Sequence, residues 1–360
     1  MFSLIRQANM NRAELHRLLR CTGEEEELLY KKAAEVRNSV TGNAVYLRGL
    51  IEVSNACGKN CLYCGIRSGN GKVQRYLLDD RQILESALFA YKNRYGSIVL
   101  QGGENQSPLF TGKIDRLIRE IKQQTDGRLG ITLSLGEQHE ETYRQWFESG
   151  AHRYLLRIET SNPELYARIH PDDAEHSFRK RLACLESLQR CGYQTGSGVM
   201  IGLPFQTTED LANDLLFLKE RDVDMVGMGP YLEHPDTPLY AYREQLLPQR
   251  ERLRLALHAI ACLRLLVPDL NIAATTALQA IDPQGREQAL KAGANVIMPN
   301  ITPAAGRSHY KLYQNKPDYE EGAAEMLQKL ETGVREAGCR IAFDQWGDPQ
   351  HGKDRKTVRP

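Results

Sequence analysis

Short apolar runs alternate with longer amphipathic segments along most of the chain after residue 45. The eight apolar runs that we expect to form strands are 47–53, 97–101, 130–135, 153–158, 196–201, 224–228, 271–276 and 294–298. The segments between them carry the spacing of amphipathic helices. In 208–221, for example, Thr207 or Thr208 can cap the helix, and acidic residues follow in its first turn. The pattern therefore predicts repeated strand–helix units.

Eight such units predict an α/β protein with a parallel (βα)8 barrel, the TIM barrel. A doubly wound open sheet is the alternative, but it would need a G-x-G-x-x-G segment after the first strand. A loop rich in cysteine occupies that place. We expect an N-terminal helical extension over 1–45, the barrel over 46–315, and a C-terminal helix and tail over 316–360, with 344–360 partly disordered.

Composition and charge narrow the function classes. The chain has 360 residues and a formal net charge of +1, with 47 basic and 46 acidic side chains. No block of like charges suggests nucleic acid or a membrane surface as partner. No apolar run is long enough to span a bilayer, and the N-terminus lacks the apolar core of a signal peptide. We therefore expect a cytoplasmic enzyme with neither kind of partner.

Three of the eight cysteines carry the most specific signal in the sequence. Cys57, Cys61 and Cys64 have the spacing C-x3-C-x2-C, directly after the first predicted strand. A structural zinc site prefers four protein ligands. A 4Fe–4S cluster held by three thiolates leaves one iron free to bind a chelating small molecule. A zinc site completed by a distant residue and a set of ordinary loop cysteines are the alternatives. Cys184, Cys191 and Cys262 fit small core residues.

The segment CGKNCLYC resembles the cluster motif of the radical S-adenosylmethionine (SAM) superfamily, with Tyr63 as its aromatic residue. This resemblance implies a barrel of the radical SAM type and two cofactors, a 4Fe–4S cluster and SAM. It also implies that the open iron chelates the amino and carboxylate groups of the methionine part of SAM. Reductive cleavage of SAM would then give a 5′-deoxyadenosyl radical.

Further stretches resemble one branch of that superfamily, the HydE maturases of FeFe-hydrogenase, which are grouped with biotin synthase and methylornithine synthase. The resemblance runs from about residue 30 to 310 and includes VLQGGEN (99–105), RYLLRIETSNPELYARIHP (153–171) and GYQTGSGVMIGLPFQT (192–207). It implies a small-molecule or organometallic iron substrate that bears carbonyl, cyanide and cysteine ligands. Other hydrogenase maturases and an electron donor are the expected protein partners.

The resemblance also implies roles for individual residues. Gly102, Gly103 and Glu104 would hold the methionine amino group, and Glu159 the ribose hydroxyls. Arg181 would pair with the methionine carboxylate, with Arg179 as the competitor because the loop before it leaves the register open. The other expected cofactor contacts are Tyr63, Ser134, Glu137 and Met200. The expected substrate contacts are Arg157, Met225, Thr275, Thr276, Asn300 and Arg307.

The sequence departs from part of this branch near the C-terminus. Some members have a second cysteine set there that binds an accessory cluster, but 308–325 contains no cysteine and Cys339 stands alone. We therefore expect one cluster only. Two other functions stay open: a radical SAM mutase or synthase with an organic substrate, and an iron–sulfur scaffold without radical chemistry. Sulfur insertion of the biotin synthase type would need an auxiliary cluster.

Overall fold

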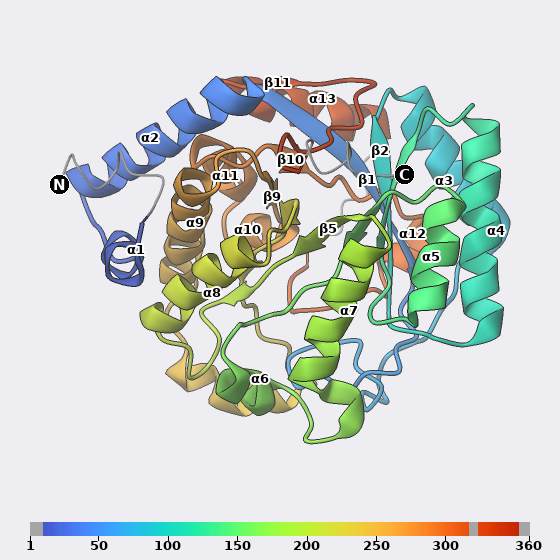
Figure 1. The fold of residues 1–360 in the computed structure, drawn as a ribbon, viewed down its shortest axis with the longest axis horizontal. Helices are drawn as coiled ribbons and strands as arrows, with labels where there is room; N and C mark the ends of the chain where they lie inside the picture. Colours follow the sequence, from blue (N-terminus) through green and yellow to red (C-terminus); the bar gives the residue numbers. More distant parts are fainter. Residues whose placement is uncertain (1–9, 317–322, 353–360) are drawn as a thin grey trace.

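Parallel strands close into a barrel in the computed structural model, which describes residues 10–316 and 323–352, with only the backbone of 323–326. The strands follow the order β10-β9-β7-β5-β4-β3-β2-β1, and β10 pairs with β1 to close the ring (Figure 1). These strands are β1 (Ala44–Ser54), β2 (Ser97–Gly102), β3 (Gly130–Ser134), β4 (Arg153–Leu155), β5 (Gln194–Ser197), β7 (Met225–Val226), β9 (Asn271–Ala274) and β10 (Val296–Ile297). The predicted closed barrel is confirmed, and the open sheet is excluded.

Two of the predicted strands are interrupted. The run 196–201 contains β5 and then β6 (Met200–Ile201), and the run 224–228 leads from β7 to β8 (Gly229–Pro230). β6 and β8 pair with each other outside the barrel sheet. At the break, a Cβ atom on Gly198 would lie 1.9 Å from the carbonyl oxygen of Gly227. Only glycine allows the two chains to approach this closely.

The helices surround the barrel, as the amphipathic segments predicted (Figure 1). Thr207 is the N-cap of α8, and Asp210 completes a capping box. No helix of the described segments is long and apolar enough to cross a membrane. The helices that follow strands of the barrel are α3 (Asp80–Lys92), α4 (Pro108–Gln124), α5 (Glu140–Glu148), α6 (Pro163–Ile169), α7 (Phe178–Arg190), α8 (Thr208–Glu220), α9 (Gln249–Leu266), α10 (Thr276–Ile281), α11 (Gly285–Lys291), α12 (Ala304–Arg307) and α13 (Ala323–Glu336).

From residue 10 onward, two helices precede the barrel, α1 (Arg12–Leu18) and α2 (Glu24–Thr41). α1 packs on α8, and α2 packs on α9. Residues 1–9 lie outside the described part of the chain. Of the three cysteines predicted to fill the core, Cys262 is fully buried in it, while Cys184 and Cys191 are half-buried and pack against the hydrophobic core.

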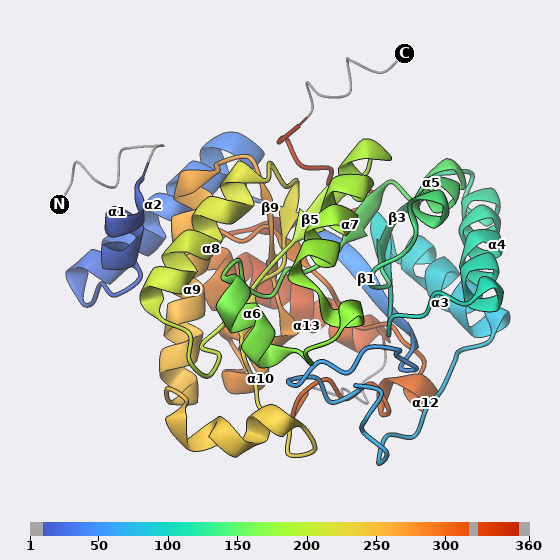
Figure 2. The same cartoon turned by 60° about the horizontal axis from the view of Figure 1, so that its bottom comes forward.

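The segment before the C-terminus closes one end of the barrel. After β11 (Arg340–Ile341) the chain crosses the end at which the strands begin, opposite the loop that follows β1 (Figure 2). There Arg153 donates to the carbonyl of Trp346, and Asn271 donates to that of Gly347. Within the predicted partly disordered tail 344–360, residues 344–352 are therefore ordered on the barrel. Residues 353–360 lie outside the described part of the chain.

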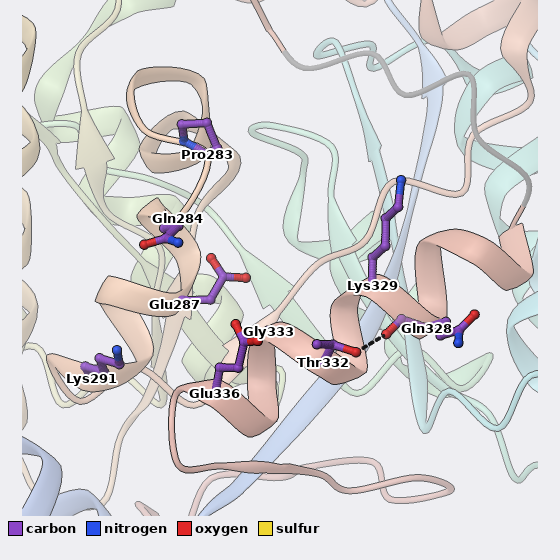
Figure 3. A pocket seen from close by; sticks show the side chains of 9 residues that line it. All are labelled: Pro283, Gln284, Glu287, Lys291, Gln328, Lys329, Thr332, Gly333 and Glu336. Atoms are coloured by element: carbon purple, nitrogen blue, oxygen red, sulfur yellow. Dashed lines mark hydrogen bonds between the residues drawn. The ribbon is translucent and has the colours of Figure 1, made fainter.

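A cleft of about 450 Å³ lies between α11 and α13 on the outside of the barrel (Figure 3). Its walls carry Glu287 and Lys291 on one side and Lys329 and Glu336 on the other. None of its lining residues was predicted from the sequence to belong to a site. The chemistry expected from the cysteine motif therefore lies elsewhere, at the ends of the barrel strands.

Candidate active site

The three cysteines lie on a long loop that follows β1 and has no helix or barrel strand of its own up to residue 79. The loop depends on contacts with the other loops at this end of the barrel. Gly58 N donates to Glu104 O at 2.8 Å, and Leu62 N donates to Ile169 O at 3.0 Å. Asn60 N donates to Nε2 of His176 at 2.8 Å. The barrel thus holds a segment that could not fold alone.

The three thiols influence one another electrostatically. Burial, and to a lesser degree the charge of Cys57, raises the pKa of Cys61 to about 12. Burial, with Cys61 and Cys57, also raises the pKa of Cys64. Buried thiolates so close together need a cationic partner to be stable. Among the described residues no three His, Cys, Asp or Glu side chains converge on a single ion. A cubane instead takes each thiolate on a different iron.

Gly103, at the end of β2, lets the next loop approach the cysteines. A Cβ atom there would lie 2.7 Å from Cβ of Cys57 and 2.4 Å from the carbonyl oxygen of Ala56. Glu104 N lies 3.3 Å from Sγ of Cys57, within the reach of an N–H···S hydrogen bond. The predicted Gly102–Gly103–Glu104 turn therefore lies directly against the cysteine loop.

Four buried charges connect the loops that follow β1, β2 and β3 to α7. Nζ of Lys59 lies 2.9 Å from Glu137 Oε2 and 3.3 Å from Glu104 Oε1. Arg181 donates from Nε to Glu137 Oε1 at 2.6 Å and from Nη1 to Arg157 O at 2.7 Å. Glu137 N donates to Glu104 Oε2 at 2.7 Å. We call Lys59, Glu104, Glu137 and Arg181 the charge cluster.

The charge cluster has two basic and two acidic side chains, and these shift one another's pKa values. Burial alone would raise the pKa of Glu137, but Arg181 and Lys59 hold it below its usual range. Burial and the neighbouring Glu137 raise the pKa of Glu104. Burial opposes the charge on Lys59, yet Glu104 and Glu137 raise its pKa. We conclude that Lys59, Arg181 and Glu137 are charged at neutral pH.

Glu159 adds a buried carboxylate in a strained backbone position. Its φ of +68° lies in the left-handed region, which a non-glycine residue adopts at a cost of about 1–3 kcal/mol. Its Oε2 lies 2.9 Å from Nη2 of Arg157, but the pair lacks hydrogen-bond geometry. Burial raises the pKa of Glu159, with Arg157 and Arg181 acting against it. Such strain with an unsatisfied oxygen is typical of a ligand site.

Tyr63 is held by a histidine that the sequence analysis missed. Its Oη lies 3.4 Å from Nε2 of His170, and the two rings meet edge to face. Nδ1 of His170 lies 2.9 Å from the carbonyl oxygen of Tyr166, so we assign the ring proton to Nδ1. Burial lowers the pKa of His170 to about 3. The ring is therefore neutral and presents an acceptor to Tyr63.

We expect this neutral histidine to make stability depend on pH. Its pKa is about 3 when folded and about 6.5 when unfolded, so its contribution is complete above pH 6.5 and falls as the pH decreases. Relative to His170→Gln, the wild type should lose up to about 1.4 kcal/mol per pH unit between pH 6 and 4. Urea unfolding of the cluster-free protein at several pH values measures this slope. A difference that does not change with pH would contradict the assignment, and His139→Gln, at an exposed histidine, is the control.

The structure separates the two candidate arginines on α7. Arg181 lies on the buried face with Leu185 and Leu188, whereas Arg179 is exposed. Two residues correspond to about 200° around a helix, so the two side chains point to nearly opposite sides. Only Arg181 enters the charge cluster.

The other predicted contacts divide into two groups. Met225 lies deep in the barrel, where its Sδ is 3.0 Å from Nη1 of Arg48, and Arg48 in turn donates to Gly347 O of the closing segment. The structure thus places Met225 away from the cysteine loop. The remaining predicted residues lie on the cysteine side. Ser134 ends β3, Met200 begins β6, Thr275 and Thr276 follow β9, Asn300 follows β10, and Arg307 ends α12.

A further buried carboxylate, which the sequence analysis missed, lies inside the barrel on β1. Glu52 is fully buried and accepts from Asn300 Nδ2 at 3.1 Å and from the ammonium of Lys316. Lys316 also donates to Tyr310 O at 2.8 Å. Burial raises the pKa of Glu52. A charged residue within the apolar run 47–53 was the signal that could have revealed it.

Comparisons with known proteins agree with this geometry. The profile of the radical SAM superfamily matches residues 51–218, which include the cysteine loop and the charge cluster. The chain is 47% identical to the [FeFe] hydrogenase maturase subunit HydE of Thermotoga maritima over 81% of this chain and 80% of that protein. It is 30% identical to 3-methylornithine synthase of Methanosarcina acetivorans over 92% and 91% of the two chains.

The fold also matches a solved structure. The crystal structure of a methylornithine synthase superposes with a TM-score of 0.77 over 95% of this chain and 97% of that one, at 24% identity. At this level of identity the likeness supports the barrel fold alone.

Proposed function

Because the chain belongs to the radical SAM superfamily and, within it, to the HydE family, we propose that it acts in the maturation of the FeFe-hydrogenase active site. It is a radical SAM enzyme, and membership of the superfamily implies a 4Fe–4S cluster and SAM. When bound, these cofactors supply reductive cleavage of SAM to methionine and a 5′-deoxyadenosyl radical. The observation that carries the proposal is the cysteine loop held against the charge cluster at one end of a closed barrel.

The residues of this loop fit such a cluster. We propose that Cys57, Cys61 and Cys64 hold one 4Fe–4S cluster as thiolates, since burial and mutual repulsion disfavour the thiolate forms unless a cationic partner is bound. Gly103 gives the space in which the β2 loop reaches Cys57. Tyr63, held by His170, is positioned beside the cysteines. Among the described residues Cys339 is buried on the α13 side, so we propose no accessory cluster.

For SAM, we propose that the charged ends of the methionine part bind at the charge cluster. Arg181 carries a planar cation suited to a carboxylate, and Glu104 is a carboxylate suited to an ammonium. Gly102, Ser134, Glu137 and Met200 complete this part of the site. Glu159, with its strained backbone and unsatisfied oxygen, is suited to accept from ribose hydroxyls. In this proposal the protein binds, orients and shields the cofactor from water.

We propose that the substrate lies further into the barrel than the cysteine loop does. We propose contacts from Arg157, Thr275, Thr276, Asn300 and Arg307, and leave out Met225 because it lies beside Arg48. A small organometallic iron species is the proposed substrate, with other hydrogenase maturases and an electron donor as protein partners. We further propose a cytoplasmic location and the division into the extension 1–45, the barrel 46–315 and the C-terminal part 316–360.

A second function has specific support. The 30% identity to a 3-methylornithine synthase extends over 92% of this chain, so the same barrel would suit rearrangement of a small amino acid. The two functions share SAM cleavage and differ in substrate. Since a fold does not determine its substrate, the experiment must separate the two steps.

A cell-free hydrogenase maturation assay tests the proposal, with the other maturases present and this protein as the only variable. We expect hydrogen evolution with the wild type and none without it. Formation of 5′-deoxyadenosine by the reduced protein is measured in parallel. If SAM is cleaved but no hydrogenase activity appears, the proposed substrate is wrong and the amino acid rearrangement becomes the leading function.

The two arginines on α7 give a matched test of the SAM site. We expect Arg181→Met to weaken SAM binding roughly 10- to 100-fold, because a charge-assisted hydrogen bond contributes about 1.5–3 kcal/mol. Arg179→Met should bind as the wild type does, because Arg179 is exposed. Equilibrium dialysis with the reconstituted protein measures both. Equal affinities for the two variants would exclude Arg181 as a contact of the carboxylate.

A further inference from the structure

Lys59 lies between two of the cluster cysteines and is the only charged residue within the motif 57–64. It is also buried, although lysine is almost never buried without partners. Its ammonium contacts Glu104, Glu137 and the carbonyl oxygen of Glu175. These three partners come from three different loops, so one side chain of the cysteine loop contacts all of them.

Electrostatics explains why the contacts of Lys59 with Glu104 and Glu137 matter for the cysteine loop. Glu104 N lies 3.3 Å from Sγ of Cys57, so the turn that carries Glu104 lies against the cysteine loop, and Glu104 and Glu137 place two buried carboxylates there. Two buried carboxylates this close to each other are costly unless a cation neutralises them. The ammonium of Lys59 lies against both carboxylates and belongs to the loop that carries the thiols. It therefore attaches the cysteine loop to two buried carboxylates and supplies part of the positive charge that they need.

The other contacts of the motif are weaker or neutral. They include backbone hydrogen bonds from Gly58, Asn60 and Leu62, the hydrogen bonds that Asn60 Oδ1 accepts from Arg67 and Gly69, and the 3.4 Å contact of Tyr63 with His170. None of them neutralises a buried charge. By contrast, loss of Lys59 would leave Glu137 with Arg181 as its principal cation and Glu104 with none of comparable closeness in the charge cluster.

We propose that Lys59 is a positioning residue, whose ammonium fixes the cysteine loop on Glu104 and Glu137 and so places the three thiols beside the groups that would hold SAM. The inference has two halves, the fixing of the cysteine loop and the placement of its thiols beside the groups that would hold SAM. Only the second half rests on the proposed function. The placement of the loop is a property of the protein without cofactors. The two halves can therefore be tested separately.

Hydrogen–deuterium exchange of the cluster-free protein tests the first half. In Lys59→Met we expect amides of residues 57–66 to exchange at least tenfold faster than in the wild type, with exchange in α9 unchanged. Lys59→Arg should restore part of the protection. Lys180→Met is the matched control, since Lys180 is more exposed and lies 4.0 Å from Glu137. Unchanged exchange in Lys59→Met, or equal loss in Lys180→Met, would overturn the proposal.

Removal of a buried cation can unfold a protein, so a double variant accompanies the single one. Lys59→Met with Glu137→Gln removes one charge of each sign and should fold, while its cysteine loop still exchanges fast. Protection restored in this variant would show that charge balance alone, and not the Lys59 contact, holds the loop.

The reconstituted protein tests the second half. We expect Lys59→Met to retain iron but to lose more than tenfold in affinity for SAM, with a smaller SAM-induced change in the EPR spectrum of the reduced cluster. Wild-type affinity in this variant would overturn the link to SAM. If the wild type itself neither binds nor cleaves SAM, the proposed function fails, and the exchange result still decides the role of Lys59 in the loop.

Discussion

Cys61→Ala is expected to abolish both the bound cluster and SAM cleavage while leaving the barrel folded. Cys61 is the middle cysteine of the motif, and its buried thiol is coupled electrostatically to that of Cys57. Two remaining thiolates cannot hold three irons of a cubane. The substitution removes only one sulfur atom from a loop that Lys59, Gly58 and Leu62 still anchor. We therefore expect 5′-deoxyadenosine formation to fall below detection.

Iron content, the EPR spectrum after reduction and circular dichroism separate loss of the cluster from loss of the fold. Cys191→Ala is the matched control, because Cys191 is half-buried at the end of α7 and outside the cysteine loop. It should retain iron and activity. A reducible 4Fe–4S signal in Cys61→Ala would refute the ligand assignment, whatever the activity.

The sequence predicted the barrel and the position of the cysteines, because both depend on local pattern. Strand periodicity and the C-x3-C-x2-C spacing are visible within short windows, and the structure confirms all eight barrel strands. The register at α7 was not predictable in this way. The choice between Arg179 and Arg181 depends on Ser177 capping the helix, which fixes the face that turns inward.

Long-range pairing explains what the sequence analysis missed. Lys59, Glu52 and His170 all find partners on other loops, 78 residues away for Lys59 and Glu137 and 248 for Glu52 and Asn300. Nothing in the spacing of single residues indicates such pairs. A charged residue within an apolar strand or a metal motif was the available signal, and it points to a buried, paired group.

The segment that closes the barrel, residues 344–352, is a case in which the sequence suggested too little order. Residues 344–352 are polar and contain glycine and proline, a composition typical of a mobile tail. These residues are ordered because they contact groups that the barrel buries at the end where its strands begin. Arg153 and Arg48 are buried there, and the segment supplies carbonyl oxygens to both and the carboxylate of Asp348 to Arg153. The composition of the segment does not reveal that Arg153 and Arg48 are its partners.

Asp348→Asn is accordingly expected to cost about 3 kcal/mol of unfolding free energy. Asp348 lies 2.7 Å from Nη1 of Arg153, whose side chain is fully buried. Removing one partner of a buried ion pair typically costs about 3–5 kcal/mol, and we expect the lower end because Asp348 itself is 27% exposed. Asparagine keeps the shape, so the loss reports the charge. Urea unfolding of the cluster-free protein at neutral pH measures it.

The same segment provides the control, since Asp344 pairs with Arg94 at a similar distance of 2.8 Å but with both side chains more than half exposed. Asp344→Asn should cost at most about 1 kcal/mol. The pH dependence adds a second criterion. Burial acts in the opposite direction, but His152 and Arg153 hold the pKa of Asp348 well below its usual range. The contribution of Asp348 is therefore complete above about pH 4 and is lost as the pH falls further. If the two variants unfolded at the same urea concentration, or if their difference persisted unchanged into strong acid, the buried charge of Arg153 would not be what orders the segment.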